Sequence, residues 1–146
     1  MGPLTGFRIV EFAGIGPGPM AAMLFADLGA SIIRLDRLTP SGLGIDKPAR
    51  FELIARSRPS VAVDLKHPEG LALAADLIGE ADALIEGFRP GTMERLGLGP
   101  EAALARNPRL VYGRINGMGT IGSAGSGGGV PLPFVHRRER YRCDRL

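Results

Sequence analysis

Apolar residues along this chain fall into short continuous runs separated by segments with helical character. The runs have the length of buried β-strands. We predict strands at 9–12, 31–35, 61–65, 83–86 and 110–115. After the first run, Met20, Met23, Leu24 and Leu28 share one helical face, and Gly29 suits a C-terminal cap. We predict a helix from Pro17 or Pro19 to residue 28, and further helices at 68–79, 91–96 and 100–106. Strands that alternate with helices indicate an α/β fold, with a mainly parallel sheet and helices on both faces.

Glycine and proline mark the limits of the folded part. The segment 39–59 contains five such residues and is predicted to be a loop. Between Gly117 and Gly129 seven of thirteen residues are glycine, and the rest of the chain is rich in arginine without apolar periodicity. Such a composition buries little apolar surface, so we expect disorder. The chain is therefore divided into a Rossmann-like domain, residues 1–118, and a Gly/Arg-rich tail, residues 119–146.

The composition is that of an ordinary soluble protein, with 45% hydrophobic and 23% charged residues. The formal net charge of +3 arises entirely in the tail, because basic and acidic residues are equal in number before it. The domain itself is neutral, so its charge gives no reason to expect nucleic acid as a partner. A tail that binds RNA or a membrane surface is the alternative interpretation, and solvated charge is the simpler one.

The cysteine content and the apolar stretches indicate in which cellular compartment the protein is expected. Cys143 is the only cysteine, which excludes an intrachain disulfide. The N-terminus lacks a basic segment followed by an apolar run, the pattern of a secretory signal. Asp27 and Arg34 interrupt the longest apolar stretch, so we predict no transmembrane helix and no membrane partner. We therefore expect a cytoplasmic protein, and we predict no metal site.

The turn from Gly14 to Pro19 has some features of a dinucleotide-binding loop. Asp36 follows about 20 residues later, as that fingerprint requires. However, Pro19 stands where the third glycine would fall, and Pro17 and Pro19 remove two N–H groups that would hold a pyrophosphate. These prolines argue against an NAD- or FAD-binding oxidoreductase.

The same turn carries a family resemblance. FAGIGPGPMAAMLFADLGASIIRLDR at 12–37 resembles the N-terminus of α-methylacyl-CoA racemases, members of the family III CoA-transferase superfamily. The resemblance continues through VAVDLKHPEG at 61–70, ADALIEGFRPGTMERLGLGPE at 81–101 and NPRLVYGRINGMG at 107–119. The motifs agree in order and spacing over residues 3–119. The GIGPGP turn favours the racemase branch over formyl-CoA transferases, whose turn typically contains glutamine.

The resemblance implies a chain that binds coenzyme A (CoA) thioesters. CoA would be part of the substrate, so no separate cofactor is implied. The reaction would be epimerisation of 2-methylacyl-CoA thioesters in lipid metabolism. Arginine and lysine suit the phosphates of CoA, and glycine lets the backbone approach a ligand closely. Carried onto this sequence, the family's CoA-binding residues are Arg37, Val63, Asp64, Leu65, Lys66, Gly87, Phe88, Arg89 and Arg95.

Three of these charged residues also have an alternative role on the surface. Arg37 would pair with Asp36 or lie in solvent, and Lys66 would be a solvated strand end. Arg95 would pair with an acidic neighbour, either Glu94 or Glu101.

The chain departs from the family in its catalytic segment. A racemase needs two acid/base groups, one on each side of the α-carbon. In the family they are a histidine in an A-G-H-D segment, shortly after a G-x-G-Q turn, and a later aspartate. This chain has Gly117-Met118-Gly119-Thr120 at the turn and no A-G-H-D segment, and neither His67 nor His136 lies in a similar one. We therefore predict no catalytic residue.

The abrupt change of composition near residue 120 suggests a hypothesis about the tail. Glycine, proline and arginine are favoured by out-of-frame GC-rich codons, so the tail would be a frameshifted reading of a longer gene. The chain would then be an incomplete N-terminal part of the family III fold, inactive as a racemase alone. It would lack most of the interlocked homodimer interface of full-length members. A CoA-transferase fragment and a truncated product without function are the alternatives.

Overall fold

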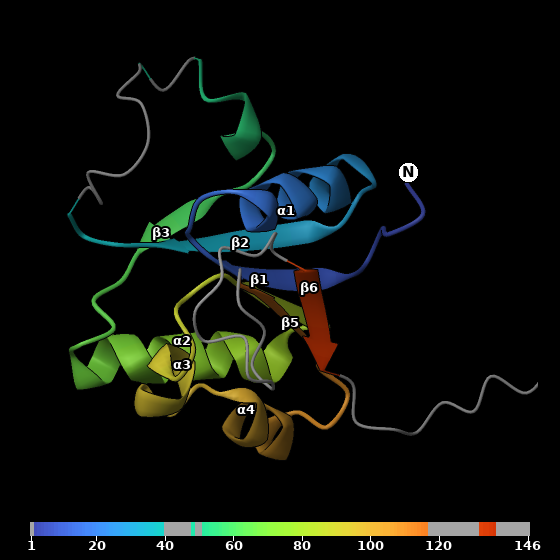
Figure 1. The fold of residues 1–146 in the computed structure, drawn as a ribbon. Coiled ribbons are helices and arrows are strands. Elements are labelled where there is room, and N and C mark those ends of the chain that lie inside the picture. Colours follow the sequence, from blue (N-terminus) through green and yellow to red (C-terminus); the bar gives the residue numbers. More distant parts are fainter. Residues whose placement is uncertain (1, 40–47, 49–50, 117–131, 137–146) are drawn as a thin grey trace, which may run out of the picture.

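The computed structural model describes residues 2–39, 48, 51–116 and 132–136 (Figure 1). Its strands form one sheet in the order β3-β2-β1-β4-β5-β6. All neighbouring strands are parallel except the pair β5 and β6, which is antiparallel. The strands are β1 Arg8–Phe12, β2 Ser31–Asp36, β3 Ser60–Ala62, β4 Ala83–Glu86, β5 Val111–Asn116 and β6 Leu132–His136.

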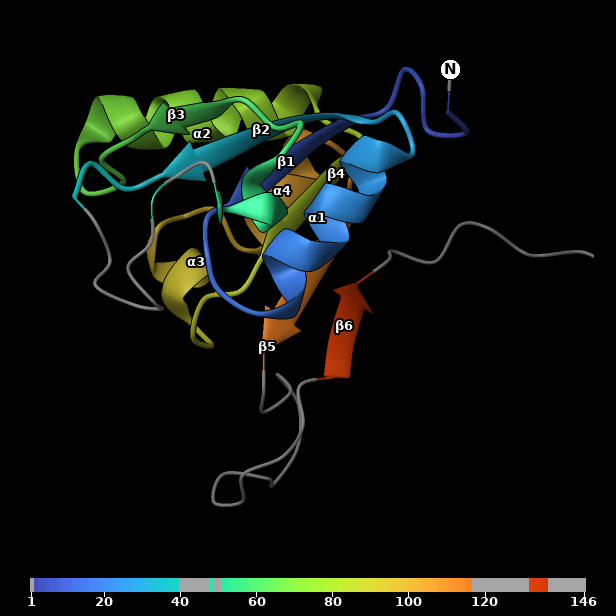
Figure 2. The ribbon, with the colours of Figure 1, turned by 90° about the horizontal axis from the view of Figure 1, so that it is seen from above.

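Helices cover both faces of this sheet, which confirms the predicted α/β architecture. α1 lies on one face, and α2, α3 and α4 lie on the other (Figure 1). A short 3-10 helix, η2, lies beside α1 (Figure 2). The helices are α1 Pro17–Asp27, η2 Leu53–Ala55, α2 Pro68–Glu80, α3 Thr92–Arg95 and α4 Pro100–Arg106. Three of them begin with proline in the first turn, where the missing N–H has no intrahelical partner.

Alternation along the strands divides the apolar core into two layers. Val10 and Phe12 of β1 point to the layer beneath α2, α3 and α4, whereas Ile9 points to the layer beneath α1. Successive side chains of a strand face opposite sides of the sheet. A parallel sheet buried on both faces therefore needs continuous apolar runs, which is the pattern that predicted these strands.

Gly29 sets the tight connection between α1 and β2. Its φ of 100° lies in the left-handed region, and a Cβ there would lie 2.9 Å from Thr5 Oγ1. The N–H of the next residue, Ala30, donates to Phe25 O at 3.0 Å and so closes the end of the helix. Glycine at this position therefore satisfies both the backbone conformation and the space available.

The third strand is shorter than its apolar run suggests. β3 ends at Ala62, and the residues that follow form a turn. The Asp64 carboxylate accepts the Lys66 N–H at 2.9 Å, and Asp64 O accepts the His67 N–H at 3.1 Å. These local bonds replace ladder bonds, so the predicted strand end becomes the entry to α2.

Two other elements were not predicted. η2 forms within the segment 39–59, where the pattern predicts only a loop. β6 forms within the Gly/Arg-rich tail and pairs with β5 from Asn116↔Leu132 to Tyr112↔His136. The tail residues 119–131 and 137–146, with Cys143, lie outside the described residues, so the predicted disorder there stays a prediction. In the described part of the chain no helix is long and apolar enough to span a membrane, and no acidic, histidine or cysteine side chains cluster as metal ligands.

A buried ion pair ties the segment after η2 to the start of α1. Arg58 Nη1 donates to Glu11 Oε2 at 2.5 Å, and both side chains are fully shielded from solvent. Arg58 also donates to Pro19 O at 3.1 Å and to Ile54 O. One guanidinium therefore joins β1, α1 and η2. Burial raises the pKa of Glu11 more than the nearby Arg58 and Arg34 lower it.

The pKa of Glu11 leads to an expected pH dependence. The folded chain holds the Glu11 proton more tightly than the unfolded chain, because the folded pKa lies above the ordinary value of 4.5. The stability that this proton contributes is complete below that value and is lost as the pH rises through the folded pKa. The free energy of unfolding of the wild type, relative to Glu11→Gln, should therefore fall with rising pH. Urea unfolding of both proteins from about pH 4 to pH 7 measures this difference. A relative stability of the wild type that increases with pH would contradict the prediction.

Candidate functional site

Two adjoining cavities open at the carboxyl ends of the central parallel strands. The larger has a volume of about 600 Å³ and the smaller about 390 Å³. We call the two together the cleft. Ligands of open α/β sheets bind at this edge, where loops after neighbouring strands diverge. The residues that line both cavities are Ala13, Asp36, Arg37, Thr39 and Phe88.

The cleft brings together eight of the nine residues predicted to bind CoA. Arg37, Phe88 and the turn Val63–Lys66 line the larger cavity. Gly87 and Arg89 line the smaller one, together with Arg37 and Phe88.

Arg95 is the exception, because it lines neither cavity. Its Nη2 donates to Thr92 Oγ1 at 3.1 Å, and Thr92 lines the larger cavity. Arg95 is therefore connected to the cleft through one side chain.

Part of the lining of the cleft is apolar, and we call this part the apolar wall. Val63 is buried, Leu65 packs against the core, and the rings of Phe12 and Phe88 meet edge to face with centroids 5.8 Å apart. Leu35, Leu38 and Leu96 extend the apolar lining of the larger cavity. This wall suits the flat or apolar part of a ligand.

Another part of the lining is cationic. The acidic side chains of the cleft already have partners: Asp36 accepts from Arg34 Nη2 at 3.0 Å, and Asp64 accepts the backbone N–H of Lys66. The partner of Asp36 is thus Arg34 and not Arg37. In the described part of the chain, the charged groups of Arg37, Lys66 and Arg89 have no carboxylate partner. Exposed and unpaired, these cations can accept an anion without first breaking an ion pair.

A polar cluster lies next to the cleft, in which Glu86 and Arg114 are buried and the Glu94 side chain is 45% exposed. Glu86, at the end of β4, accepts the Phe88 N–H at 2.8 Å with Oε2 and Arg114 Nε at 2.6 Å with Oε1. Arg114 Nη2 also donates to Glu94 Oε1 at 2.7 Å. Burial raises the pKa of Glu86 more than the Phe88 N–H and Arg114 lower it. Burial would also raise the pKa of Glu94, but the bond with Arg114 and backbone N–H groups outweigh it, so that pKa is lowered.

Several cleft residues were not among those predicted to bind CoA. Gly14 and Ile15 follow β1, and Leu38 and Thr39 follow β2. Their position just after a predicted parallel strand is the signal that could have identified them. The residues of the neighbouring polar cluster carry no such signal, because Arg114 pairs with Glu86 and Glu94 over long separations in the sequence.

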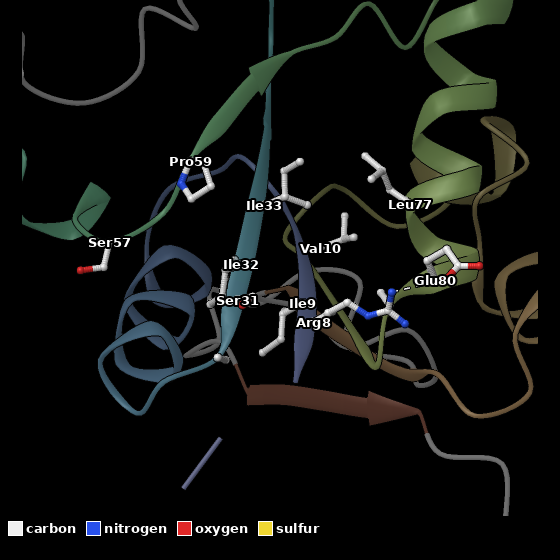
Figure 3. A pocket seen from close by; sticks show the side chains of 12 residues that line it. Arg8, Ile9, Val10, Ser31, Ile32, Ile33, Ser57, Pro59, Leu77 and Glu80 are labelled. Atoms are coloured by element: carbon white, nitrogen blue, oxygen red, sulfur yellow. Dashed lines mark hydrogen bonds and ion pairs between the residues drawn. The ribbon is translucent and has the colours of Figure 1, made fainter. Parts of the chain in front are cut away.

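A third cavity, of about 480 Å³, lies beside the amino-terminal ends of β1 and β2 (Figure 3). β3 pairs only with Arg34–Asp36 of β2, so the edge of β2 near Ile32 is not covered by that strand. Arg8 and Glu80, the charged residues of this cavity, form an ion pair at 3.4 Å (Figure 3). None of the predicted site residues lines it, and it offers a ligand no unpaired cation. The cleft is therefore the stronger candidate site.

Comparison with known proteins gives consistent results. The family model for CoA-transferase family III matches residues 4–130, beyond Gly119 where the resemblance noted in the sequence ends. The chain is 42% identical over 119 residues to the alpha-methylacyl-CoA racemase of Mus musculus. The aligned region covers 82% of this chain and 29% of that protein. It is 38% identical over 141 residues to a probable fatty acyl-CoA transferase of Mycobacterium tuberculosis, covering 89% and 35%.

Solved structures agree in fold. A crystal structure of a variant of the same mycobacterial protein superposes with a TM-score of 0.78 and 38% identity, over 88% of this chain and 37% of that chain. A CaiB/BaiF family protein of Brucella suis superposes with a TM-score of 0.76 and 32% identity, over 88% and 37%. The chain thus spans about a third of the length of the relatives that it matches.

Proposed function

The chain belongs to CoA-transferase family III, and on this premise we propose that it binds CoA thioesters in the cleft. The observation that carries the proposal is that one cleft combines an apolar wall with three cations that have no carboxylate partner among the described residues. Arg37, Lys66 and Arg89 come from three different loops at the same edge of the sheet.

The chemistry of CoA matches this arrangement. Its 3′-phosphate and pyrophosphate are anions that arginine and lysine bind through charge-assisted hydrogen bonds. Its adenine ring has two apolar faces, and either can pack on the apolar wall that includes Val63, Leu65 and Phe88. Gly87 has no side chain to obstruct the backbone beside the smaller cavity. Arg95 is proposed as a further CoA-binding residue through its contact with Thr92.

For the reaction we propose the racemase class. A base removes the α-proton of a 2-methylacyl-CoA thioester, and a proton returns to the opposite face. The relative named as a racemase in Mus musculus and the GIGPGP turn support this class. The alternative is transfer of CoA between acids, supported by the relative named as a succinyl-CoA–L-malate CoA-transferase subunit in Chloroflexus aurantiacus, 36% identical over 133 residues. In either case the residues of this chain are proposed to recognise CoA, and the acid/base groups are not among them.

Calorimetric titration of the full chain with CoA tests the proposed binding. We expect Arg37→Ala and Arg89→Ala each to weaken CoA binding roughly tenfold, since each removes a charge-assisted bond to a phosphate. Dephospho-CoA, which lacks the 3′-phosphate, should bind more weakly than CoA. A separate assay measures solvent deuterium incorporation into 2-methylacyl-CoA in the presence of the chain. We expect this incorporation to stay at the level measured without protein.

Arg109→Ala is the matched control, because Arg109 is an exposed arginine just before β5, at the opposite edge of the sheet. Its removal should leave the affinity for CoA unchanged. Equal affinities of the wild type and of an Arg37→Ala, Arg89→Ala double variant would refute binding in the cleft.

A further inference from the structure

We propose that Glu86, Arg114 and Glu94 form a positioning cluster that holds both ends of the loop 87–91 and thereby sets the affinity for CoA. The inference rests on the proposed function, because this loop carries Gly87, Phe88 and Arg89. The three cluster residues line neither cavity of the cleft, so they act on a ligand only through the loop.

The first end of the loop is fixed by Glu86. Its side chain is almost completely buried at the end of β4, and both carboxylate oxygens are used. Oε2 accepts the N–H of Phe88, only two residues further along the chain, at 2.8 Å. Oε1 accepts Arg114 Nε at 2.6 Å, from the neighbouring residue of β5 in the sheet register. The direction in which the chain leaves β4 is thus set by a carboxylate that cannot turn freely.

The second end is fixed through Glu94 in α3. Arg114 Nη2 donates to Glu94 Oε1 at 2.7 Å. The loop enters α3 through Gly91, which has a φ of 79° and accepts the Arg95 N–H at 3.1 Å. One buried guanidinium therefore holds the residue before the loop and a residue of the helix after it.

The form of this cluster indicates more than stabilisation of the core. Apolar residues of similar volume often stabilise a buried site as well as an ion pair does. An arginine that donates to two carboxylates instead fixes the orientation of both carboxylates relative to each other, because its donors form a rigid planar fork. Phe88 belongs to the apolar wall, and the neighbouring Arg89 is one of the three cations. The loop must therefore keep one orientation for both side chains to contact the same ligand.

Glu94→Gln and Arg114→Lys test the cluster in the full chain. Glutamine keeps the shape of Glu94 without its charge, and lysine keeps the charge of Arg114 without the fork. We expect each to weaken CoA binding roughly tenfold. In an Arg89→Ala background Glu94→Gln should weaken binding less, because the side chain that the loop presents is already absent. Hydrogen exchange of the Phe88 amide, followed by NMR, should be faster in both variants.

Asp76→Asn is the control for loss of an ion pair. Asp76 Oδ1 accepts from Arg106 Nη2 at 2.5 Å on the outer surface of α2 and α4, away from the loop. This variant should change neither the affinity for CoA nor the exchange of the Phe88 amide. Wild-type affinity in Glu94→Gln and Arg114→Lys would overturn the proposal, and so would weaker binding with unchanged exchange at Phe88. If the wild type binds no CoA, the proposed function fails, and the exchange rates still decide whether the cluster holds the loop.

Discussion

Replacement of Arg58 by alanine is expected to lower the free energy of unfolding by about 3–5 kcal/mol, the cost of leaving a buried charge without its partner. The carboxylate of Glu11 is fully shielded from solvent and would lose the guanidinium that balances its charge. The carbonyl oxygens of Pro19 and Ile54 would lose the same donor. Since these groups lie in three elements, the loss should loosen the contact between η2 and α1.

Urea unfolding of the wild type and Arg58→Ala measures this effect. Arg106→Ala is the control, because Arg106 also pairs with a carboxylate but is half exposed, and such a pair contributes at most about 1 kcal/mol. A Glu11→Leu, Arg58→Met double variant removes both charges and should recover most of the lost stability. A loss below about 1 kcal/mol for Arg58→Ala would show that water or protonation of Glu11 replaces the missing partner.

The elements of the fold could largely be predicted because their signals are local. Four of the five apolar runs became strands within a residue or so of their predicted ends. Helices α2 and α4 begin at the expected prolines, and α1 begins at Pro17, the first of its two candidate prolines. The run at 61–65 was misleading because Val63 and Leu65 are apolar for packing beside the cleft, while Asp64 bonds to the backbone of Lys66 and ends the strand early. A pattern of hydrophobicity does not record such a competing hydrogen bond.

The candidate site could be predicted in part, for a different reason. Arg37, Lys66 and Arg89 each follow a strand in a motif with a recognisable order, and parallel strands bring their carboxyl ends to one edge. The pairing of Glu86 with Arg114 depends on the register of β4 against β5, which a single sequence does not give. Glu11 had the same difficulty, because a lone acid in an apolar run shows nothing of its distant partner.

Gly70→Ala is expected to destabilise the chain by about 1–3 kcal/mol, as overpacking of a filled site does. A Cβ on Gly70, in the first turn of α2, would lie 2.1 Å from Asp64 O and 3.1 Å from Val63 Cγ1. The nearest atom is backbone, so it cannot rotate away. The turn Val63–Lys66 would have to move, and this turn lines the larger cavity. Weaker binding of CoA should therefore accompany the loss of stability.

Gly79→Ala provides the matched control, because it is the same substitution in the same helix. A Cβ on Gly79 would meet Arg106 Nε at 3.2 Å, and that side chain is half exposed and can shift. Alanine is better than glycine inside a helix by about 0.5–1 kcal/mol, so this variant should be as stable as the wild type or more stable. Urea unfolding and CoA titration of both variants measure the contrast. Equal effects would contradict the close packing of α2 on Asp64, because helix propensity alone predicts that both replacements stabilise the chain.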